Sequence, residues 1–233
     1  MKTNNKYAIV ITTFENNIGY KLAGINTFLK HTPDNVDIFY IYGGNQNKEI
    51  QNNTGKPNWC DIFLDVPDRI TMVHKKLYKF FSKYKKVLSK YLYIIKIDDD
   101  TFINNIDEID FDKLKGDYIG KKIDISEENE IQLRTKFHHL KNYKIREMYN
   151  GELPTQFCSG ECVIFSYESI KRIISYQGFY KRTNFGLEDI FTGAILNNNE
   201  VKITNNKLIS YEHSVKENDF YKLYNTHYKK ELK

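Results

Sequence analysis

The first hundred residues alternate between short runs of consecutive apolar residues and segments with sparser apolar positions. The runs at 7–14, 36–44 and 59–66 are rich in β-branched and aromatic residues, which is typical of strands buried on both faces. The segment 19–31, between the first two runs, is predicted to form a helix.

The most regular helical pattern follows the third of these runs. Its apolar residues keep a spacing close to the helical period and therefore lie on one face of a helix. They are Val73, Leu77, Phe80, Phe81, Tyr84, Val87 and Leu88. A further apolar run at 91–97 predicts another strand buried on both faces. Strands that alternate with helices in this way predict an α/β fold with a Rossmann-like, mostly parallel central sheet flanked by helices.

The second half of the chain continues with shorter elements. Residues 121–150 are charged and irregular, and we expect them to form an excursion over one face of the fold. Ser166 directly precedes an expected helix and is predicted to cap it. The basic tail 219–233 is expected to be helical or frayed. The other expected elements are strands at 117–120 and 161–166 and helices at 167–176 and 186–196.

Composition narrows the classes of protein that the chain can belong to. Hydrophobic residues make up 40% of the chain and aromatic residues 15%, which is enough for a packed core. The net charge of +5 comes from lysine, and the few arginines suit solubility better than bidentate recognition of phosphates or bases. We therefore expect no nucleic-acid partner.

Cysteine usage and hydropathy bear on the compartment. No apolar run approaches the roughly 20 residues of a transmembrane helix, so no membrane span is expected. The N-terminal segment has no signal-peptide layout, and Cys60, Cys158 and Cys162 are an odd number of cysteines. These features favour a reducing compartment, and we expect a cytoplasmic protein.

Three consecutive aspartates, Asp98, Asp99 and Asp100, directly follow the run at 91–97. Open α/β sheets bind their ligands at the carboxyl ends of the strands, which is where this triplet is expected. Residues two apart in extended chain point to the same side, so Asp98 and Asp100 are expected to face one point and Asp99 to face away. Two such carboxylates offer hard oxygen ligands to Mg²⁺ or Mn²⁺. The alternative is a solvated acidic turn at the end of a strand.

A second acidic pair, Glu188 and Asp189, begins the helix expected at 186–196. The buried face expected for this helix consists of Leu187, Ile190, Phe191, Ala194 and Ile195. Asp189 falls nearly opposite that face and is expected to point into a cleft or into solvent. The alternative is that both acids only complement the positive end of the helix dipole.

Five segments, taken in order along the chain, are similar to motifs of one known family. The segment "DRITMVHKKLYKFF" resembles a helix that begins N-L-T-L-K-T, and "KIDDDTFIN" resembles K-x-D-D-D-x-F-V-N. "PTQFCSGECVIFS" resembles Y-P-P-Y-C-S-G-G-G-Y-V-L-S, "LEDIFTG" resembles E-D-V-Y-x-G, and "EHSVKEN" resembles H-S-x-x-E-N. The chain thus resembles glycosyltransferase family 31, the β-1,3-galactosyltransferase and Fringe group, over most of residues 7–218.

The resemblance implies a GT-A fold in one catalytic domain over residues 1–233. Its nucleotide-sugar-binding half would span about 1–104 and its acceptor-side half about 105–218, with the basic tail after them. It implies an inverting transferase of the β-1,3 type, which moves a sugar from a UDP-sugar to a hydroxyl of a glycan, glycoprotein or glycolipid. The implied cofactor is Mn²⁺ or Mg²⁺.

The resemblance also implies roles for individual residues. Asp189 matches the catalytic base of the family's E-D-V motif. The implied metal site consists of Asp98, Asp100 and His213. The residues implied in binding the donor are Thr12, Thr13, Lys21, Lys76, Asp98, Asp99, Gly160, Glu161 and Glu188. For His213 the alternative is a core histidine, and for Lys76 it is a surface lysine with a partly covered stem.

The chain departs from the family pattern at two places. Lys21 stands where an arginine is expected and Phe28 replaces a tryptophan, while the glycine run is reduced to Gly160, Glu161 and Cys162. The sequence looks like a bare catalytic domain, from a bacterium or from the viral-factory cytoplasm of a large DNA virus. Two other hypotheses stay open: a degenerate sugar-nucleotide-binding or scaffold protein, and a metal-dependent phosphohydrolase or nucleotidyltransferase that uses the same aspartates.

Overall fold

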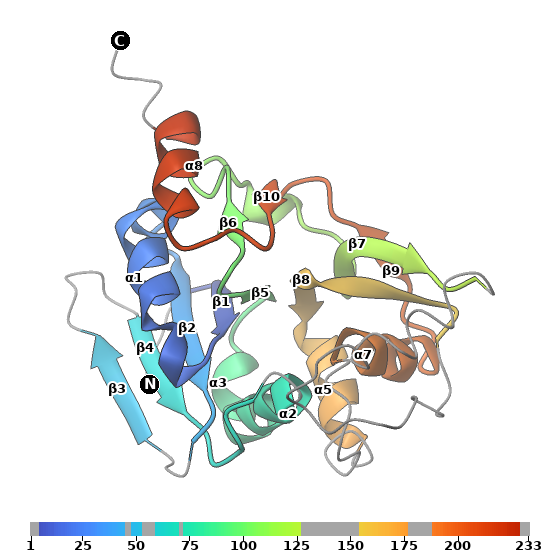
Figure 1. Ribbon diagram of the computed structural model, residues 1–233. Coiled ribbons are helices and arrows are strands. Elements are labelled where there is room, and N and C mark those ends of the chain that lie inside the picture. Colours follow the sequence, from blue (N-terminus) through green and yellow to red (C-terminus); the bar gives the residue numbers. More distant parts are fainter. Residues whose placement is uncertain are drawn as a thin grey trace.

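The structure is a computed structural model, and it describes residues 5–44, 48–52, 59–69, 72–126, 154–176 and 188–228. Its centre is an eight-stranded sheet in the order β3-β4-β2-β1-β5-β8-β7-β9 (Figure 1). The strands are β1 (Tyr7–Thr12), β2 (Val36–Tyr42), β3 (Lys48–Asn52), β4 (Trp59–Phe63), β5 (Tyr93–Asp98), β7 (Tyr118–Asp124), β8 (Gln156–Ser166) and β9 (Ile203–Asn205).

The sheet is mostly parallel. Strands β4, β2, β1, β5, β7 and β9 run in one direction, and β3 and β8 run against them. The central strand β1 pairs with β2 and β5, and this register places Thr12 beside Ile41 and Asp98. The carboxyl ends of these three strands therefore meet at one edge of the sheet. The predicted α/β fold with a mostly parallel central sheet is confirmed.

Helices cover both faces of the sheet (Figure 1). They are α1 (Ile18–Asn26), α2 (Val73–Lys83), α3 (Lys85–Leu88), α5 (Tyr167–Ser175), α7 (Glu188–Asn197) and α8 (Asp219–His227). Short 3₁₀ helices occupy Glu15–Asn17, Phe28–His31 and Phe111–Lys113, and a separate antiparallel pair joins β6 (Phe102–Ile103) to β10 (Tyr211–Glu212). None of the helices in the described ranges has both the length and the apolar character to cross a membrane.

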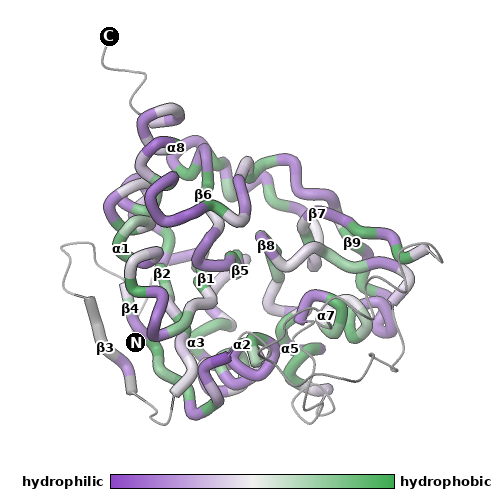
Figure 2. The backbone as a smooth tube through the Cα atoms, in the orientation of Figure 1, coloured by the Kyte–Doolittle hydropathy of each residue, from purple (hydrophilic) through white to green (hydrophobic). Residues whose placement is uncertain are grey.

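Strand β1 shows why the central runs are apolar without interruption. Ala8 and Val10 belong to a buried cluster that includes side chains of α2, α5 and α7. Ile9 and Ile11 point the other way, into a second cluster with residues of α1 and α8. Both faces of the strand are therefore covered, as expected for a parallel sheet enclosed by helices. The outer helix α8 and the loop before it are mostly hydrophilic (Figure 2).

Two of the predicted helices are interrupted. The helix expected at 19–31 ends at Asn26, because Thr27 leaves the helical conformation and its hydroxyl donates a hydrogen bond to the carbonyl of Ala23 at 2.6 Å. A 3₁₀ turn then completes the segment. The helix expected over 73–88 divides at Tyr84 into α2 and α3.

Other expectations from the second half of the chain have mixed outcomes. Ser166 caps α5 as predicted, since its hydroxyl accepts a hydrogen bond from the amide of Ser169 at 3.3 Å. Residues 121–124 were expected to be irregular, but they extend strand β7, because residues 122–124 pair with β8 after a shift in register. The rest of the expected excursion, from 127 to 150, lies outside the described residues.

The expected buried face of α7 is wrong in part. Ala194 is only half-buried, whereas Glu188, Thr192 and Gly193 are buried, and Leu187 lies outside the described residues. The reason is that α7 is covered on several sides, by β8, α5 and α2. A helix enclosed in this way has no single apolar stripe.

Gly193 provides a test of how closely α7 packs on β8. A Cβ at this position would lie 2.5 Å from the Cβ atom of Phe157 and 3.1 Å from its Cα atom. Helix propensity favours alanine over glycine by about 1 kcal/mol, but overpacking costs about 1–3 kcal/mol. We expect Gly193→Ala to lower the free energy of unfolding, measured by urea denaturation.

The matched control is Gly19→Ala in α1. A Cβ there would meet only the flexible end of the Glu217 side chain, which can move away. We expect this variant to be neutral or to gain up to about 1 kcal/mol. Equal effects of the two substitutions would contradict the close packing of α7 on β8.

Candidate active site

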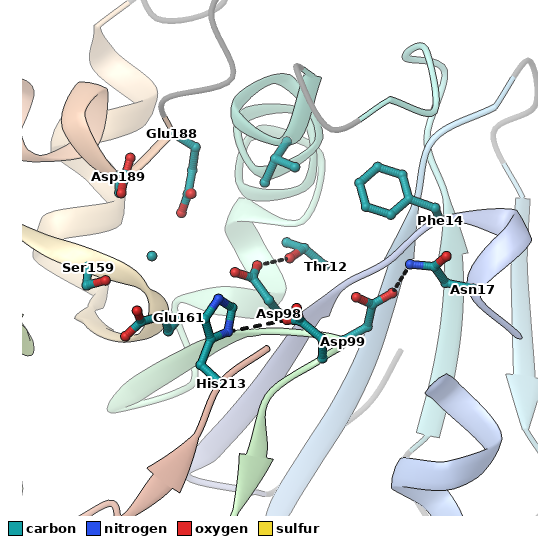
Figure 3. Close-up of a pocket in the computed structure, with 13 residues that line it drawn as sticks. Thr12, Phe14, Asn17, Asp98, Asp99, Ser159, Glu161, Glu188, Asp189 and His213 are labelled. Carbon is teal, nitrogen blue, oxygen red and sulfur yellow. Dashed lines mark hydrogen bonds and ion pairs between the residues drawn. The ribbon is translucent and has the colours of Figure 1, made fainter. Parts of the chain in front are cut away.

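A cavity of about 340 Å³ lies at the carboxyl ends of β1 and β5, between these strands, β8 and the beginning of α7 (Figure 3). This is the edge at which open α/β sheets bind ligands. The cavity is lined by Thr12, Phe14, Asn17, Val73, Asp98, Asp99, Asp100, Ser159, Gly160, Glu161, Glu188, Asp189 and His213.

The acidic triplet forms the turn that ends β5, and its side chains separate. Ligand atoms of Asp98, Asp100 and His213 lie within 4.8 Å of one another. The carboxylate of Asp99 turns to a different set of partners, accepting hydrogen bonds from the Thr13 hydroxyl at 2.6 Å and the Asn17 amide at 2.9 Å. The prediction that Asp98 and Asp100 face one point while Asp99 faces away is therefore confirmed.

The small β6–β10 pair brings His213 to the triplet. Phe102 and Ile103 are buried one residue beyond the triplet, and Phe102 pairs with Glu212, the residue before His213. The Nδ1 atom of His213 lies 3.3 Å from Oδ1 of Asp100 and 3.2 Å from the hydroxyl of Thr101. His213 thus lies on the wall of the cavity, and the alternative of a core histidine is wrong.

The donor set suits a hard divalent cation. Carboxylate oxygens and an imidazole nitrogen are ligands that Mn²⁺ accepts, and water or substrate phosphates complete such sites. Oδ1 of Asp98 accepts from the Thr12 hydroxyl at 2.7 Å and from the Lys96 ammonium at 2.8 Å. These bonds leave Oδ2 as the oxygen that Asp98 can offer to an ion.

The crowding of these carboxylates changes their proton affinity. Burial raises the pKa of Asp99 to about 6, although its hydrogen bonds from Thr13 and Asn17 oppose the rise. Burial raises the pKa of Asp100 as well. The neighbouring charge of Asp98 adds to this rise, and His213 opposes it. Like charges held together in a partly buried site favour a bound cation, which offsets their repulsion.

The second acidic pair lies on another wall of the same cavity. Glu188 and Asp189 come from the first turn of α7, and both line the space (Figure 3). Asp189 is half-buried, and its Oδ1 accepts a hydrogen bond from the amide of Ile190 at 2.9 Å. Of the two expected directions for Asp189, into a cleft or into solvent, the structure shows the cleft. Glu188 is buried, which raises its pKa, while the ammonium of Lys96 opposes this rise.

Lys96 joins the two walls, and sequence reasoning did not identify it as a site residue. It is fully buried in β5, and its ammonium lies 2.8 Å from Asp98 Oδ1 and 3.2 Å from Glu188 Oε1. It also donates a hydrogen bond to the carbonyl of Gly160 at 2.6 Å. Burial alone would lower the pKa of Lys96, but Asp98 and Glu188 raise it above its ordinary value. The available signal was a charged residue inside an otherwise apolar strand.

Lys76 and Thr13 support the cavity from behind. Lys76 is fully buried, so it is not a surface lysine, and its ammonium lies 2.6 Å from Oδ1 of Asp68. It donates a hydrogen bond to the carbonyl of Thr13 at 2.7 Å and lies 3.7 Å from the ring centre of Phe14. Burial lowers the pKa of Lys76, while Asp68 opposes this effect.

Lys21 is placed away from the other predicted site residues. It is buried in α1 and forms an ion pair with Asp61 of β4, near the rings of Tyr40 and Tyr42. It does not line the described cavity. Phe28, at the position of the family's tryptophan, is a buried core residue.

Four lining residues were not predicted: Phe14, Asn17, Val73 and Ser159. Phe14 and Asn17 lie in the connection that follows β1, at the carboxyl end of a central strand, and Asn17 ends its short 3₁₀ helix. Their position could have identified them, because loops at this edge line the ligand site of open α/β sheets.

Comparisons with known proteins place the chain in a family. The family model described as Galactosyltransferase matches residues 30–207, and the chain belongs to this family of glycosyltransferases. No curated protein matches the chain. Among solved structures, the chain is similar to the apo structure of WbbM, a bifunctional glycosyltransferase, with 14% sequence identity and a TM-score of 0.49. That match covers 89% of this chain and 40% of the WbbM chain.

The ion pair behind the cavity can be tested through stability. Asp68 pairs with the buried Lys76 and accepts hydrogen bonds from the amides of Gly43 at 2.9 Å and Glu15 at 2.7 Å. Because Asp68→Ala leaves a buried ammonium without its carboxylate, we expect the free energy of unfolding to fall by about 3 kcal/mol. Urea denaturation measures the change.

The control is Asp107→Ala, which removes a carboxylate from an exposed position. We expect it to change the free energy of unfolding by less than about 0.5 kcal/mol. A loss at Asp68 no larger than that at Asp107 would show that the Lys76 ion pair contributes little to the fold.

Proposed function

We propose that the chain is an inverting, metal-dependent glycosyltransferase that moves a sugar from a UDP-sugar to a hydroxyl of a glycan or glycoconjugate, with β-1,3 linkage. One observation carries this proposal. A single cavity has the acidic triplet and His213 on one wall and the carboxylate of Asp189 on another. Family membership supports the same reaction class.

We call the wall formed by the acidic triplet and His213 the donor wall. Its residues suit the two requirements of a UDP-sugar, a metal ion at the diphosphate and direct contacts with the donor. Asp98, Asp100 and His213 would hold Mn²⁺ or Mg²⁺, which when bound supplies positive charge against the diphosphate of the leaving UDP. Thr12 and Thr13 hold the carboxylates of Asp98 and Asp99 in place through hydrogen bonds of 2.7 Å and 2.6 Å. We assign Asp99, with Gly160 and Glu161 on the neighbouring strand, to contacts with the donor.

On the opposite wall, Asp189 is assigned as the general base. Its carboxylate takes the proton from the acceptor hydroxyl while the hydroxyl oxygen attacks the anomeric carbon, and the bond from that carbon to UDP breaks. Attack from the face opposite to UDP inverts the configuration, so an α-linked donor gives a β-linked product. A carboxylate can serve as the base here, because the hydroxyl becomes acidic only as its oxygen forms the new bond.

Two other functions receive less support from the site. A phosphohydrolase or nucleotidyltransferase could use the triplet, but it has no evident use for Asp189 on the other wall. A scaffold protein that only binds sugar nucleotides needs no base at all. Incubation with UDP-galactose, UDP-N-acetylglucosamine, UDP-glucose and UDP-xylose in Mn²⁺ tests the proposal. UDP release from one of them is expected, and release of phosphate or pyrophosphate instead would overturn it.

The role of Asp189 is tested by Asp189→Asn. The amide keeps the size of the side chain but cannot accept the proton, so we expect kcat to fall by about 10²–10⁴-fold. The affinities for UDP and Mn²⁺, measured by calorimetry, should stay close to those of the wild type. Sugar transfer at the wild-type rate would refute the assignment of the base.

The metal site is tested by Mn²⁺ titration without substrate. We expect Asp100→Ala and His213→Ala each to weaken Mn²⁺ binding by at least about 10-fold, because each removes a ligand atom. His227→Ala is the matched control, since His227 lies in α8 outside the cavity lining. Mn²⁺ affinity that is equal in the His213 and His227 variants would exclude His213 from the site.

A further inference from the structure

One buried ammonium group connects three separate segments of the proposed active site. Lys96 Nζ contacts Asp98 at the end of β5, Glu188 at the start of α7 and the carbonyl of Gly160 in β8. The lysine side chain has no exposed surface, and that of Glu188 has only 9%. The ammonium itself is therefore shielded from solvent, and its contacts are made with the protein.

The backbone of β8 is shaped to admit this contact. A Cβ at Gly160 would lie 3.0 Å from Glu188 Oε2, 3.5 Å from the Cβ of Asp189 and 3.6 Å from Lys96 Nζ. A glycine at this position lets the strand, the lysine and the first turn of α7 approach one another closely. Lys96 and both acids of α7 are thus packed as one unit.

The ammonium of Lys96 occupies one oxygen of each of its two carboxylate partners. It binds Oδ1 of Asp98, the same oxygen that accepts from Thr12, and Oε1 of Glu188. Each bond fixes the orientation of a carboxylate, and Glu188 is the residue directly before Asp189. The distance between the donor wall and Asp189 therefore depends on a cation that does not itself line the cavity.

We propose that Lys96, acting through Glu188, is a positioning residue that fixes the distance and orientation of the base Asp189 relative to the donor wall. This inference rests on the proposed glycosyl transfer. It assigns Glu188 to Lys96 and α7 instead of to direct contact with the donor. A misplacement of reacting groups by about 1 Å can cost about 100-fold in rate, so such a tether affects kcat.

The test compares Glu188→Ala with Glu188→Gln. The alanine variant removes the acceptor for Lys96, and we expect kcat to fall by about 10–100-fold. The affinity for UDP with Mn²⁺, measured by calorimetry, should stay within about threefold, because the donor wall is unchanged. The glutamine variant keeps an acceptor oxygen and should recover most of kcat.

Two outcomes would overturn the inference. Glu188→Ala with the wild-type kcat would show that the tether does not position the base. A loss that appears in UDP affinity or in the donor KM, and that glutamine does not repair, would show that Glu188 contacts the donor directly.

Lys96→Met supplies an independent measurement. We expect kcat to fall while Mn²⁺ affinity stays equal or rises, because Thr12 still holds Oδ1 of Asp98 and a positive charge next to the ion's ligands has been removed. Mn²⁺ affinity that falls in parallel with kcat would instead indicate a general structural role and would overturn the inference. If this variant does not fold, the two Glu188 variants decide. Lys113→Met, which breaks an exposed ion pair with Asp110, is the control and should transfer sugar at the wild-type rate.

Failure of the inference differs from failure of the proposed function. Wild-type protein that releases UDP from no UDP-sugar overturns both. Wild-type protein that transfers sugar, together with a Glu188→Ala variant of unchanged kcat, overturns only the role of Lys96.

Discussion

The cost of burying charge governs how this protein is built. Carboxylates are concentrated where apolar strands end, and such groups are tolerated in a protein interior only when they are paired and hydrogen-bonded. Three lysines meet this requirement from inside the fold. Lys96 pairs with Asp98 and Glu188, Lys76 pairs with Asp68, and Lys21 pairs with Asp61. The first two lie directly behind the cavity, so the stability of the core and the shape of the site rest on the same ion pairs.

The arrangement of the sheet explains why the site lies where it does. Two apolar clusters enclose β1 from both faces, which leaves its carboxyl end as the place where polar side chains can gather. The parallel pairing of β1 and β5 then sets Thr12 beside Asp98. The antiparallel strand β8 crosses next to β5 and supplies Gly160 and Glu161, while α7 closes the space from the other side.

Local patterns were sufficient to predict the central part of the fold. The apolar runs of β1, β2, β4 and β5 and the place of the triplet follow from short stretches of sequence, because burial on both faces leaves an uninterrupted run of apolar residues. Helix interruptions at Thr27 and Tyr84 were missed, since they depend on tertiary packing and local hydrogen bonds. Lys96 was missed for a similar reason. Its partners come from three segments that only the folded chain brings together.

Some residues of the site could likewise be predicted from local geometry, and others could not. The opposite directions of Asp98 and Asp99 could be derived from strand geometry, and Asp189 from the periodicity of its helix. His213 could be identified only through the resemblance, because β10 is two residues long and pairs with an equally short β6. The division of the chain into a nucleotide-sugar-binding half and an acceptor-side half stays a prediction.

The β6–β10 pair has a consequence for the order in which the protein matures. Thr101 and His213 are 112 residues apart in the chain, yet their side chains lie 3.2 Å from each other. Contacts of such long sequence separation form late, because a large loop must first be closed. A nascent chain that has formed β1 and β5 already carries Asp98 and Asp100 but lacks the imidazole. The proposed cation site would therefore be complete only after the segment that carries β10 has paired with β6, so cation binding would report on this late step of folding.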